Sequence, residues 1–259
     1  MASDKRGGMA DAPQLKREFD RDGYAVLRGF LPGDELERLR SHTARYVEKV
    51  VPTLDRTEAM YEDRNRRETL KHLPRMEDHD PYFSSLLHSD RLVELAEVLM
   101  GGPVVPQNVQ WFNKAPGQSE PTPPHQDGYY FMLEPNEAVT LWLALDDVDD
   151  ANGCVRYLPG THRLGLREHT RSNVLGFSQG VAGYGSQDEA SETPIHAKPG
   201  DLLAHHSLAI HLADANTTPD RQRRAISLVY YSQRARKDKT KTVSYQQDLH
   251  ADLVNKGRL

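Results

Sequence analysis

Six short stretches rich in β-branched and other apolar residues follow one another after Pro103, with turn residues between them. This succession constrains the fold more than any other feature, because regularly spaced short strands with Gly and Pro turns are typical of a β sandwich or barrel. The strongest turn signals are Asn152-Gly153, Pro159-Gly160 and Pro199-Gly200. The predicted strands cover residues 104–113, 139–146, 154–158, 195–197, 201–206 and 225–232.

The first hundred residues have a different pattern, that of amphipathic helices. Apolar residues recur at helical spacing from residue 35 to 50, after a turn and helix cap at Pro32-Gly33-Asp34. A second helix is predicted over residues 86–100, ended by Gly101-Gly102-Pro103. The chain is therefore predicted to be mainly β with flanking helices.

The length of 259 residues fits one sizeable domain, since β sandwiches and barrels commonly occupy this whole length. Residues 1–12 are small and charged and predict a disordered leader, so that a single domain would span residues 13–259. A glycine-rich stretch around Gly176, Gly180, Gly183 and Gly185 predicts a mobile surface loop. Such a loop can be a lid over a site or a plain connection.

The charge balance argues against a bulk electrostatic role. With 33 Lys and Arg against 38 Asp and Glu, the formal net charge is −5, which calls for neither nucleic acid nor an anionic membrane as a partner. Cys154 is the single cysteine of the sequence, so an internal disulfide is excluded and a reducing, cytoplasmic location is predicted. The expected partner is a small-molecule substrate, and the sequence leaves open whether the chain is a monomer or a homo-oligomer.

One short motif offers ligands for a metal. His125 and Asp127 stand two residues apart, so in an extended backbone both side chains project to the same side and can share one ion. A third donor is needed, and His211, at the boundary of a predicted strand, is the candidate. Two histidines and one carboxylate on one face of an octahedron leave three positions open for a bidentate cosubstrate and dioxygen, as in non-haem iron(II) oxygenases.

An arginine downstream of His211 fits 2-oxoglutarate as that cosubstrate. The planar guanidinium of Arg223 could hold the distal carboxylate in a bidentate pair. Strand alternation puts Arg223 on the face of Ala225 and Ser227, whose small side chains leave room for a ligand, whereas Arg224 shares its face with bulky residues. Arg223 is therefore favoured over Arg224 as the anchor.

These residues resemble a known family, the phytanoyl-CoA dioxygenase family of iron(II)- and 2-oxoglutarate-dependent oxygenases. The resemblance covers about half of the chain, and its motifs run in the family's order. They are His125-Gln126-Asp127, Thr140-Leu141-Trp142-Leu143-Ala144-Leu145-Asp146-Asp147, Asn152-Gly153-Cys154 with Pro159-Gly160-Thr161-His162, Gly200-Asp201 with His211, and Asn216 with Arg223-Arg224-Ala225.

The resemblance implies a double-stranded β-helix, a cupin-like jelly roll, with helices packed on one sheet. It implies Fe(II) held by the three metal ligands named above, with 2-oxoglutarate and O2 as cosubstrates. It further implies that Arg223 anchors 2-oxoglutarate and that Gln110 and Trp142 line the cosubstrate pocket.

Other contacts around the site are less constrained. Tyr129, Tyr130 and Phe131 follow the metal motif and could form an aromatic wall over the substrate, or a cation-binding face if the substrate carries an amine. The alternative is that they belong to the core. By the resemblance, His206 lies beside the metal ligands, although a purely structural role is equally open. Either Lys71 or His72 reaches the cosubstrate. Nothing in the sequence identifies the substrate.

The predicted activity is that of a hydroxylase, an Fe(II)- and 2-oxoglutarate-dependent dioxygenase that oxidises a C–H bond of a small molecule and forms succinate and CO2. Asp127 favours hydroxylation over halogenation, because related halogenases vacate this position for chloride. Two alternatives stay open: a module that binds metal and 2-oxoglutarate without turnover, and a cupin-like hydrolase or isomerase with zinc or manganese. Arg223 disfavours the second, which has no cosubstrate carboxylate to bind.

Overall fold

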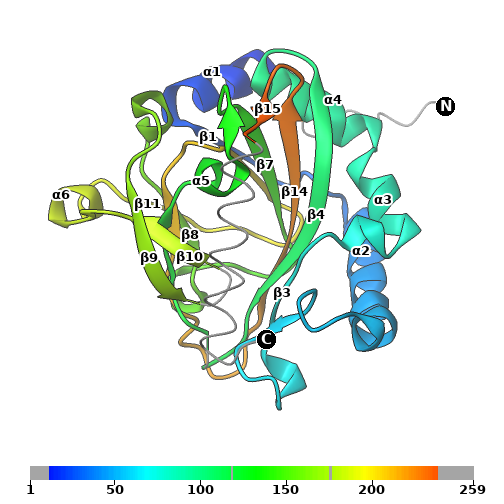
Figure 1. Cartoon of the computed structure of the whole chain (residues 1–259). Helices are drawn as coiled ribbons and strands as arrows, with labels where there is room; N and C mark the ends of the chain where they lie inside the picture. The colour runs from blue at the N-terminus through cyan, green and yellow to red at the C-terminus, as the bar shows by residue number, and fades with distance from the viewer. Residues whose placement is uncertain (1–11, 118, 175–176, 239–259) are drawn as a thin grey trace.

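Two facing antiparallel sheets form the centre of the protein, with helices packed on the outer side of the larger sheet (Figure 1). The computed structural model describes residues 12–117, 119–174 and 177–238. The larger sheet has seven strands in the order β1-β12-β7-β14-β4-β3-β2, and the smaller sheet has four in the order β11-β8-β13-β5. The architecture is a double-stranded β-helix, or jelly roll, which confirms the predicted fold class.

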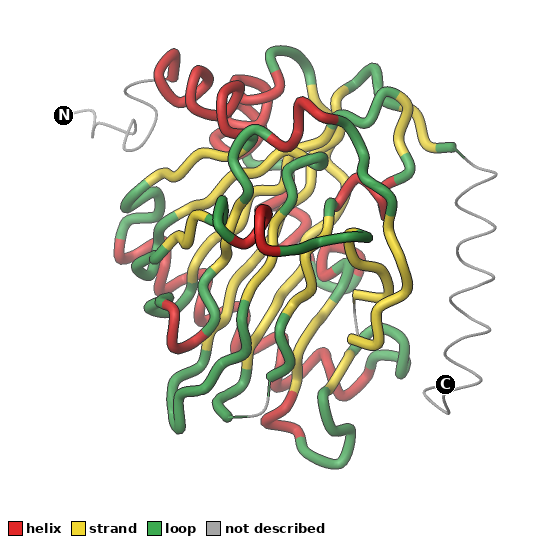
Figure 2. Tube along the Cα trace, turned by 90° about the vertical axis from the view of Figure 1, so that its left-hand side faces the viewer, coloured by secondary structure: helices red, strands yellow, loops and turns green. Residues whose placement is uncertain are grey.

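The strands run side by side through the molecule (Figure 2). The larger sheet consists of β1 (Tyr24–Leu27), β12 (Leu202–His206), β7 (Ala138–Ala144), β14 (Arg223–Ser232), β4 (Val104–Lys114), β3 (Leu70–Leu73) and β2 (Met60–Tyr61). The smaller sheet consists of β11 (Thr193–Ile195), β8 (Val155–Tyr157), β13 (His211–Ala213) and β5 (Thr122–His125). Two separate strand pairs are β9 (His169–Val174) with β10 (Phe177–Val181), and β6 (Leu133–Glu134) with β15 (Arg236–Lys237).

Three helices lie along the outer side of β4 and β14, and α1 lies at one end of the sheets (Figure 1). The helices are α1 (Ala12–Asp22), α2 (Gly33–Arg45), α3 (Pro81–Leu87), α4 (Asp90–Met100), and the short α5 (Asp127–Phe131) and α6 (Ser186–Glu189). A π-helical turn, Tyr46–Val50, continues α2. Short 3-10 turns occur at Val51–Thr53, Arg67–Thr69, Met76–Asp78, Asp150–Asn152 and Thr161–Leu164.

Strand β7 is buried on both faces, so the larger sheet separates two apolar cores. Leu141 and Leu143 belong to the core shared with the helices. Trp142 and Ala144 belong to the core shared with the smaller sheet. Because both faces are covered, the strand is apolar except for Thr140 and does not alternate between apolar and polar residues.

The helix predicted over residues 86–100 is wrong in its continuity. The structure has two helices there, α3 and α4, because His88 leaves the helical region and Ser89 is extended, with φ −67° and ψ 133°. Asp80 caps α3 by accepting a hydrogen bond from the Tyr82 backbone N–H. Gly101, with φ 70°, ends α4 as predicted.

The glycine-rich stretch is also organised differently from the prediction. Residues 177–181 form β10, which pairs with β9 and is not a loop. A Cβ on Gly180 would lie 3.4 Å from both Pro123 Cβ and the Pro124 carbonyl oxygen, so glycine allows β10 to pack closely on β5. Gly176 lies outside the described residues, as does the predicted leader except for Ala12, which begins α1.

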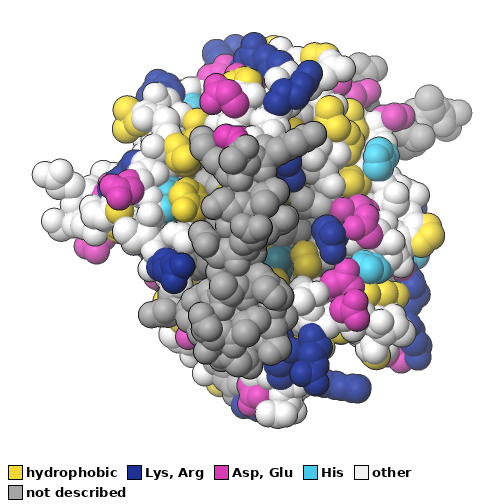
Figure 3. All heavy atoms as spheres, in the orientation of Figure 1, with side chains coloured by type: hydrophobic (Ala, Val, Ile, Leu, Met, Phe, Trp, Pro, Cys, Tyr) yellow, Lys and Arg dark blue, Asp and Glu magenta, His cyan; other side chains and the backbone are white. Residues whose placement is uncertain are grey.

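Two surface properties bear on the possible partners. In the part of the chain that the structure describes, no helix has both the length and the apolar character that crossing a bilayer requires. On the face shown in Figure 3, basic side chains lie among acidic ones. This arrangement accords with the small formal net charge of −5.

Two buried tyrosines test the packing of the helices on the larger sheet. The Tyr230 hydroxyl donates a hydrogen bond to the Leu87 carbonyl at 2.9 Å and so joins β14 to α3. Tyr230→Phe should lower the free energy of unfolding by about 1–2 kcal/mol, because the buried carbonyl loses its donor. The control is Tyr46→Phe, since the equally buried Tyr46 hydroxyl has no partner among the described residues. Denaturant unfolding that gave equal losses for both variants would contradict this role of the Tyr230 hydroxyl.

Candidate metal centre and its cavity

His125 and His211 lie directly opposite each other on neighbouring strands. Strands β5 and β13 are antiparallel, and these two residues are partners in their register. The centroids of the two imidazole rings are 4.1 Å apart. The strand pairing therefore brings together two histidines that are far apart in the sequence.

Asp127 completes the group from the end of β5. The strand stops at His125, Gln126 remains extended, and Asp127 is the first residue of α5. Its Oδ1 lies 3.6 Å from His125 Nε2 and 3.7 Å from His211 Nε2. Donor atoms bound to one first-row ion at about 2.1 Å lie about 3 Å apart, so small shifts would close the three atoms on an ion.

Backbone carbonyls orient the imidazole rings of both histidines. His125 Nδ1 lies 2.9 Å from the Pro123 carbonyl oxygen, and His211 Nδ1 lies 3.1 Å from that of Ala209. A carbonyl only accepts, so each Nδ1 donates its hydrogen to the backbone and each Nε2 is left facing Asp127. Burial, with the nearby rings of His125 and His205, lowers the pKa of His211 well below its ordinary value. The lowered pKa keeps the His211 ring neutral near pH 7, and both rings direct Nε2 at Asp127.

Two side-chain hydrogen bonds hold the second carboxylate oxygen of Asp127. Its Oδ2 accepts hydrogen bonds from Thr140 Oγ1 at 2.7 Å and from His205 Nε2 at 3.2 Å. His205 Nδ1 in turn lies 2.9 Å from the Tyr157 hydroxyl, so tyrosine holds the ring in the orientation that directs Nε2 at the carboxylate. Burial favours the protonated acid, but contacts with His125 and His205 outweigh it and hold the pKa of Asp127 well below its usual value. Oδ1 remains for a metal.

The sequence prediction missed His205 and chose its neighbour. His205 faces Asp127, whereas the His206 ring lies 6.1 Å from Phe19 and 5.6 Å from His162, between centroids. Of the two roles left open for His206, the structure therefore favours the structural one. Successive residues of a strand point to opposite faces, and two adjacent histidines give no signal about which face each occupies.

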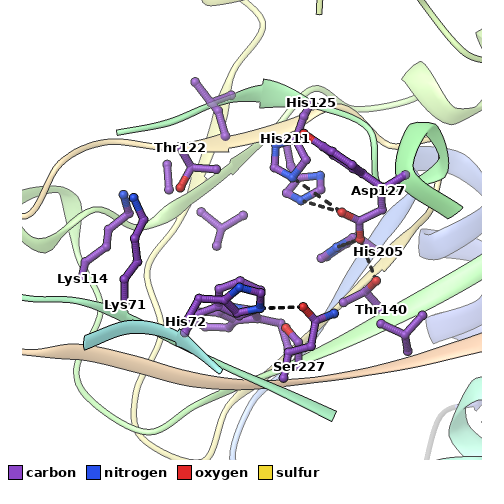
Figure 4. A pocket seen from close by; sticks show the side chains of 18 of the residues that line it. Lys71, His72, Lys114, Thr122, His125, Asp127, Thr140, His205, His211 and Ser227 are labelled. Atoms are coloured by element: carbon purple, nitrogen blue, oxygen red, sulfur yellow. Dashed lines mark hydrogen bonds and ion pairs between the residues drawn. The ribbon is translucent and has the colours of Figure 1, made fainter. Parts of the chain in front are cut away.

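The metal ligands open into a cavity of about 280 Å³ between the two sheets. Among the residues predicted to surround a cosubstrate or substrate, Gln110, Tyr130, Trp142 and Arg223 line it. In Figure 4 the metal ligands point toward one another on one side of this cavity, and lysine side chains lie on the other. The volume is at the lower end of the range of small-molecule sites, so the described walls fit a small ligand.

Arg223 faces the cavity and Arg224 does not. The Arg223 guanidinium is 5% exposed, lies 5.5 Å from the Trp142 ring, and has no hydrogen-bond or ion-pair partner among the described residues. Burial lowers its pKa to about 10, which leaves it charged at neutral pH. Arg224, on the other face of β14, donates to both carboxylate oxygens of Asp146 at 2.7 and 2.9 Å. Strand alternation thus predicted the arginine that lacks a partner.

Lys71 and His72, the alternative contacts on β3, both line the cavity (Figure 4). Lys71 forms an ion pair with Glu62 at 2.8 Å. His72 Nε2 lies 2.8 Å from Gln110 Oε1, and its ring stacks on Phe112 at 4.4 Å between centroids. Burial lowers the pKa of His72 to about 4, so this ring is neutral near pH 7.

The two tyrosines after the metal motif take different positions. Tyr130 lines the cavity, and its hydroxyl donates to the Gln179 carbonyl at 2.9 Å. Tyr129 stacks on His169 at 4.4 Å between centroids and is not among the lining residues. Of the predicted aromatic wall, the structure brings Tyr130 and Phe131 to the cavity but not Tyr129.

Comparison with known proteins agrees with this geometry. The model of the phytanoyl-CoA dioxygenase (PhyH) family matches residues 19–225, which is most of the chain. The chain belongs to the phytanoyl-CoA dioxygenase family. A probable phytanoyl-CoA dioxygenase of Caenorhabditis elegans is 28% identical over 242 residues, covering 87% of this chain and 77% of that protein. The human peroxisomal phytanoyl-CoA dioxygenase is 25% identical over 231 residues, covering 85% and 68%.

Solved structures share the fold of this family member. The epimerase SnoN in complex with Fe3+, alpha ketoglutarate and nogalamycin RO has a TM-score of 0.71 and 24% identity, covering 87% of this chain and 85% of that one. AviO1 from Streptomyces viridochromogenes has a TM-score of 0.68 and 23% identity, covering 87% and 97%. At these identities the likeness establishes the jelly-roll fold.

A second group of potential ligands, Asp150, Cys154 and His196, is a weaker candidate. Its members bond to one another, with His196 Nε2 2.7 Å and Cys154 Sγ 3.5 Å from the carboxylate of Asp150. Burial raises the pKa of the Cys154 thiol to about 12, whereas a metal binds the thiolate. The group around Asp127 is therefore the better metal centre.

The hydrogen bond from His205 to Asp127 predicts an effect on metal affinity. Mn2+ titration of the purified protein should detect one site, and His205→Leu should weaken binding about tenfold or more, because partners that orient a metal ligand are worth 10- to 100-fold. His205→Gln, which keeps an N–H donor, should lose less, about threefold. Identical Mn2+ affinities for the wild type and His205→Leu would contradict a role for His205 in the centre.

Proposed function

We propose that the protein is an Fe(II)- and 2-oxoglutarate-dependent dioxygenase that hydroxylates a C–H bond of a small-molecule substrate and releases succinate and CO2. One observation carries the proposal. A complete set of two histidines and one carboxylate opens into the same cavity as a buried arginine that has no partner among the described residues. A metal site and an anion site side by side match a metal-chelating dicarboxylate.

The donor set fits iron(II) as well as it fits any first-row metal, and it leaves coordination positions free. His125 and His211 would supply neutral imidazoles, and Asp127 would supply one oxygen. This two-histidine, one-carboxylate facial set is characteristic of non-haem Fe(II) oxygenases, in which three positions stay open for cosubstrate and O2. The retained carboxylate at position 127 favours hydroxylation over halogenation.

Arg223 is the proposed anchor of the cosubstrate. Its planar guanidinium can donate two parallel hydrogen bonds to a carboxylate, and the low exposure of the site strengthens such a pair. Trp142 would support the guanidinium through the ring 5.5 Å away. Gln110 lines the same cavity and is held by its contact with His72.

The proposed role of the protein's own residues is to bind the metal and cosubstrate, to orient the substrate, and to exclude water. When bound, Fe(II) with 2-oxoglutarate and O2 would supply an oxidative decarboxylation that forms succinate and CO2, with the second oxygen atom inserted into the substrate C–H bond. Thr140 and His205 would keep Asp127 Oδ2 occupied, so the carboxylate presents Oδ1 to the ion. Tyr130 would form part of the substrate wall, in a position fixed by its bond to the Gln179 carbonyl.

The two alternatives make different demands on the cavity. A metal hydrolase or isomerase binds no cosubstrate carboxylate that would pair with the buried Arg223, so Arg223 disfavours this alternative. A binding module without turnover would use every residue in the same way as the enzyme. Related solved structures include an alpha ketoglutarate-dependent epimerase and carbocyclase, so the identity of the product must distinguish hydroxylation from these other reactions.

Succinate formation tests the proposed activity. Protein loaded with Fe(II) under anaerobic conditions and then given 2-oxoglutarate and air should form succinate, faster with one member of a panel of polar, amine and acyl-CoA compounds. The matching product should gain one oxygen atom. Asp127→Ala should abolish both signals, because the ion loses its only carboxylate ligand. Tight 2-oxoglutarate binding without succinate under any condition would instead support the binding module.

A matched pair of arginine variants tests the cosubstrate anchor. Arg223→Met should raise the KM for 2-oxoglutarate about 100-fold, since two charge-assisted hydrogen bonds of about 1.5 kcal/mol each are lost. Arg224→Met should leave this KM within about twofold, because Arg224 binds Asp146 on the other face of the sheet. Steady-state kinetics at saturating substrate measures both. The opposite ranking of the two variants would exclude Arg223 as the anchor.

A further inference from the structure

The side of the cavity away from the metal ligands contains a second buried cation close to Arg223. Lys114, the last residue of β4, lies directly opposite Arg223, the first residue of β14, in the antiparallel register. Side chains opposite each other on adjacent strands have Cβ atoms about 5 Å apart, and like charges in this arrangement are destabilising. Both residues line the cavity. An anion between them would relieve the repulsion.

Neither cation has a carboxylate partner among the described residues. The Lys114 ammonium donates to the Glu120 backbone carbonyl at 2.7 Å, which leaves two of its N–H groups unused. Lys114 is 4% exposed and Arg223 is 5% exposed, so water contributes little to either charge. The third cation of the cavity, Lys71, differs because Glu62 neutralises it at 2.8 Å.

The Lys114 side chain is held in position by its surroundings. Gly153, with φ 81°, passes so close that a Cβ there would lie 2.9 Å from Lys114 Cδ and 2.3 Å from the Asp214 carbonyl oxygen. Asn216 Nδ2 fixes the backbone by donating to the Lys114 carbonyl at 2.8 Å. Burial, and then the charges of Arg223 and Lys71, lower the pKa of Lys114 well below its usual value, so a nearby anion would stabilise its ammonium form. Figure 4 shows its ammonium group directed along the cavity wall beside that of Lys71.

We propose that Lys114 and Arg223 together form a two-cation subsite for a carboxylate, and that its ligand is the distal carboxylate of 2-oxoglutarate. This inference rests on the proposed function, which supplies the ligand. Arg223 would contribute the planar pair of N–H donors from one strand, and Lys114 a point charge from the next. A carboxylate has enough lone pairs to accept from both at once.

The test uses full-length protein loaded with Mn2+ and compares two ligands by calorimetry. 2-Oxoglutarate carries the distal carboxylate, whereas 2-oxovalerate has the same carbon chain with a methyl group in its place. Lys114→Met should weaken 2-oxoglutarate binding about tenfold, the loss expected for one charge-assisted hydrogen bond, and should change 2-oxovalerate binding less than about twofold. Lys114→Arg, which keeps a cation, should retain most of the affinity for 2-oxoglutarate.

Each of the other outcomes overturns the inference. Unchanged 2-oxoglutarate binding by Lys114→Met would show that Lys114 does not bind the cosubstrate carboxylate. Lys114 would then be available for an anionic group of the substrate. Equal weakening of both ligands would indicate general damage to the cavity. If the wild type bound neither ligand, the proposed function itself would fail, and this result is distinct from the other two. Unfolding temperatures of the variants, compared with the wild type, show whether a loss comes from unfolding.

Discussion

The antiparallel pairing of β5 with β13 is the interaction on which the rest of the site depends. It sets His125 opposite His211, with both Nε2 atoms directed at Asp127. A shift of the register by one residue would turn His211 to the other face of its sheet and remove a ligand. The switch from strand to helix after Gln126 then brings the carboxylate to the same point. The centre is thus built from backbone geometry before any metal binds.

Charge compensation in a buried space governs the remainder of the cavity. Asp127 is supported by Thr140 and His205, so its charge is satisfied without a ligand. The guanidinium of Arg223 has no such support among the described residues, and the neighbouring ammonium of Lys114 has only a backbone carbonyl. Buried charges are unfavourable unless they are paired, so we expect the cavity to favour a ligand that is anionic at one end and chelating at the other.

The parts of the site that depend on local spacing could be predicted from the sequence. The triplet around Gln126 and the alternation of β14 each have a fixed period, so Asp127 and Arg223 could be named in advance. His205 could not, because its role depends on which face of β12 meets Thr140, a matter of tertiary pairing. Strand β10 could not be predicted from the sequence for a similar reason. Its glycine is explained by close packing on β5, a contact that composition does not reveal.

A crystal structure of the protein with Mn2+ and 2-oxoglutarate would test the central claim most directly. We predict one ion bound by His125 Nε2, Asp127 Oδ1 and His211 Nε2, chelated by the keto acid, with the distal carboxylate on Arg223. An ion bound elsewhere, for example by Asp150 and His196, would contradict the assignment of the metal centre. A 2-oxoglutarate molecule outside the cavity, or with its distal carboxylate away from Arg223, would contradict the assignment of the anchor.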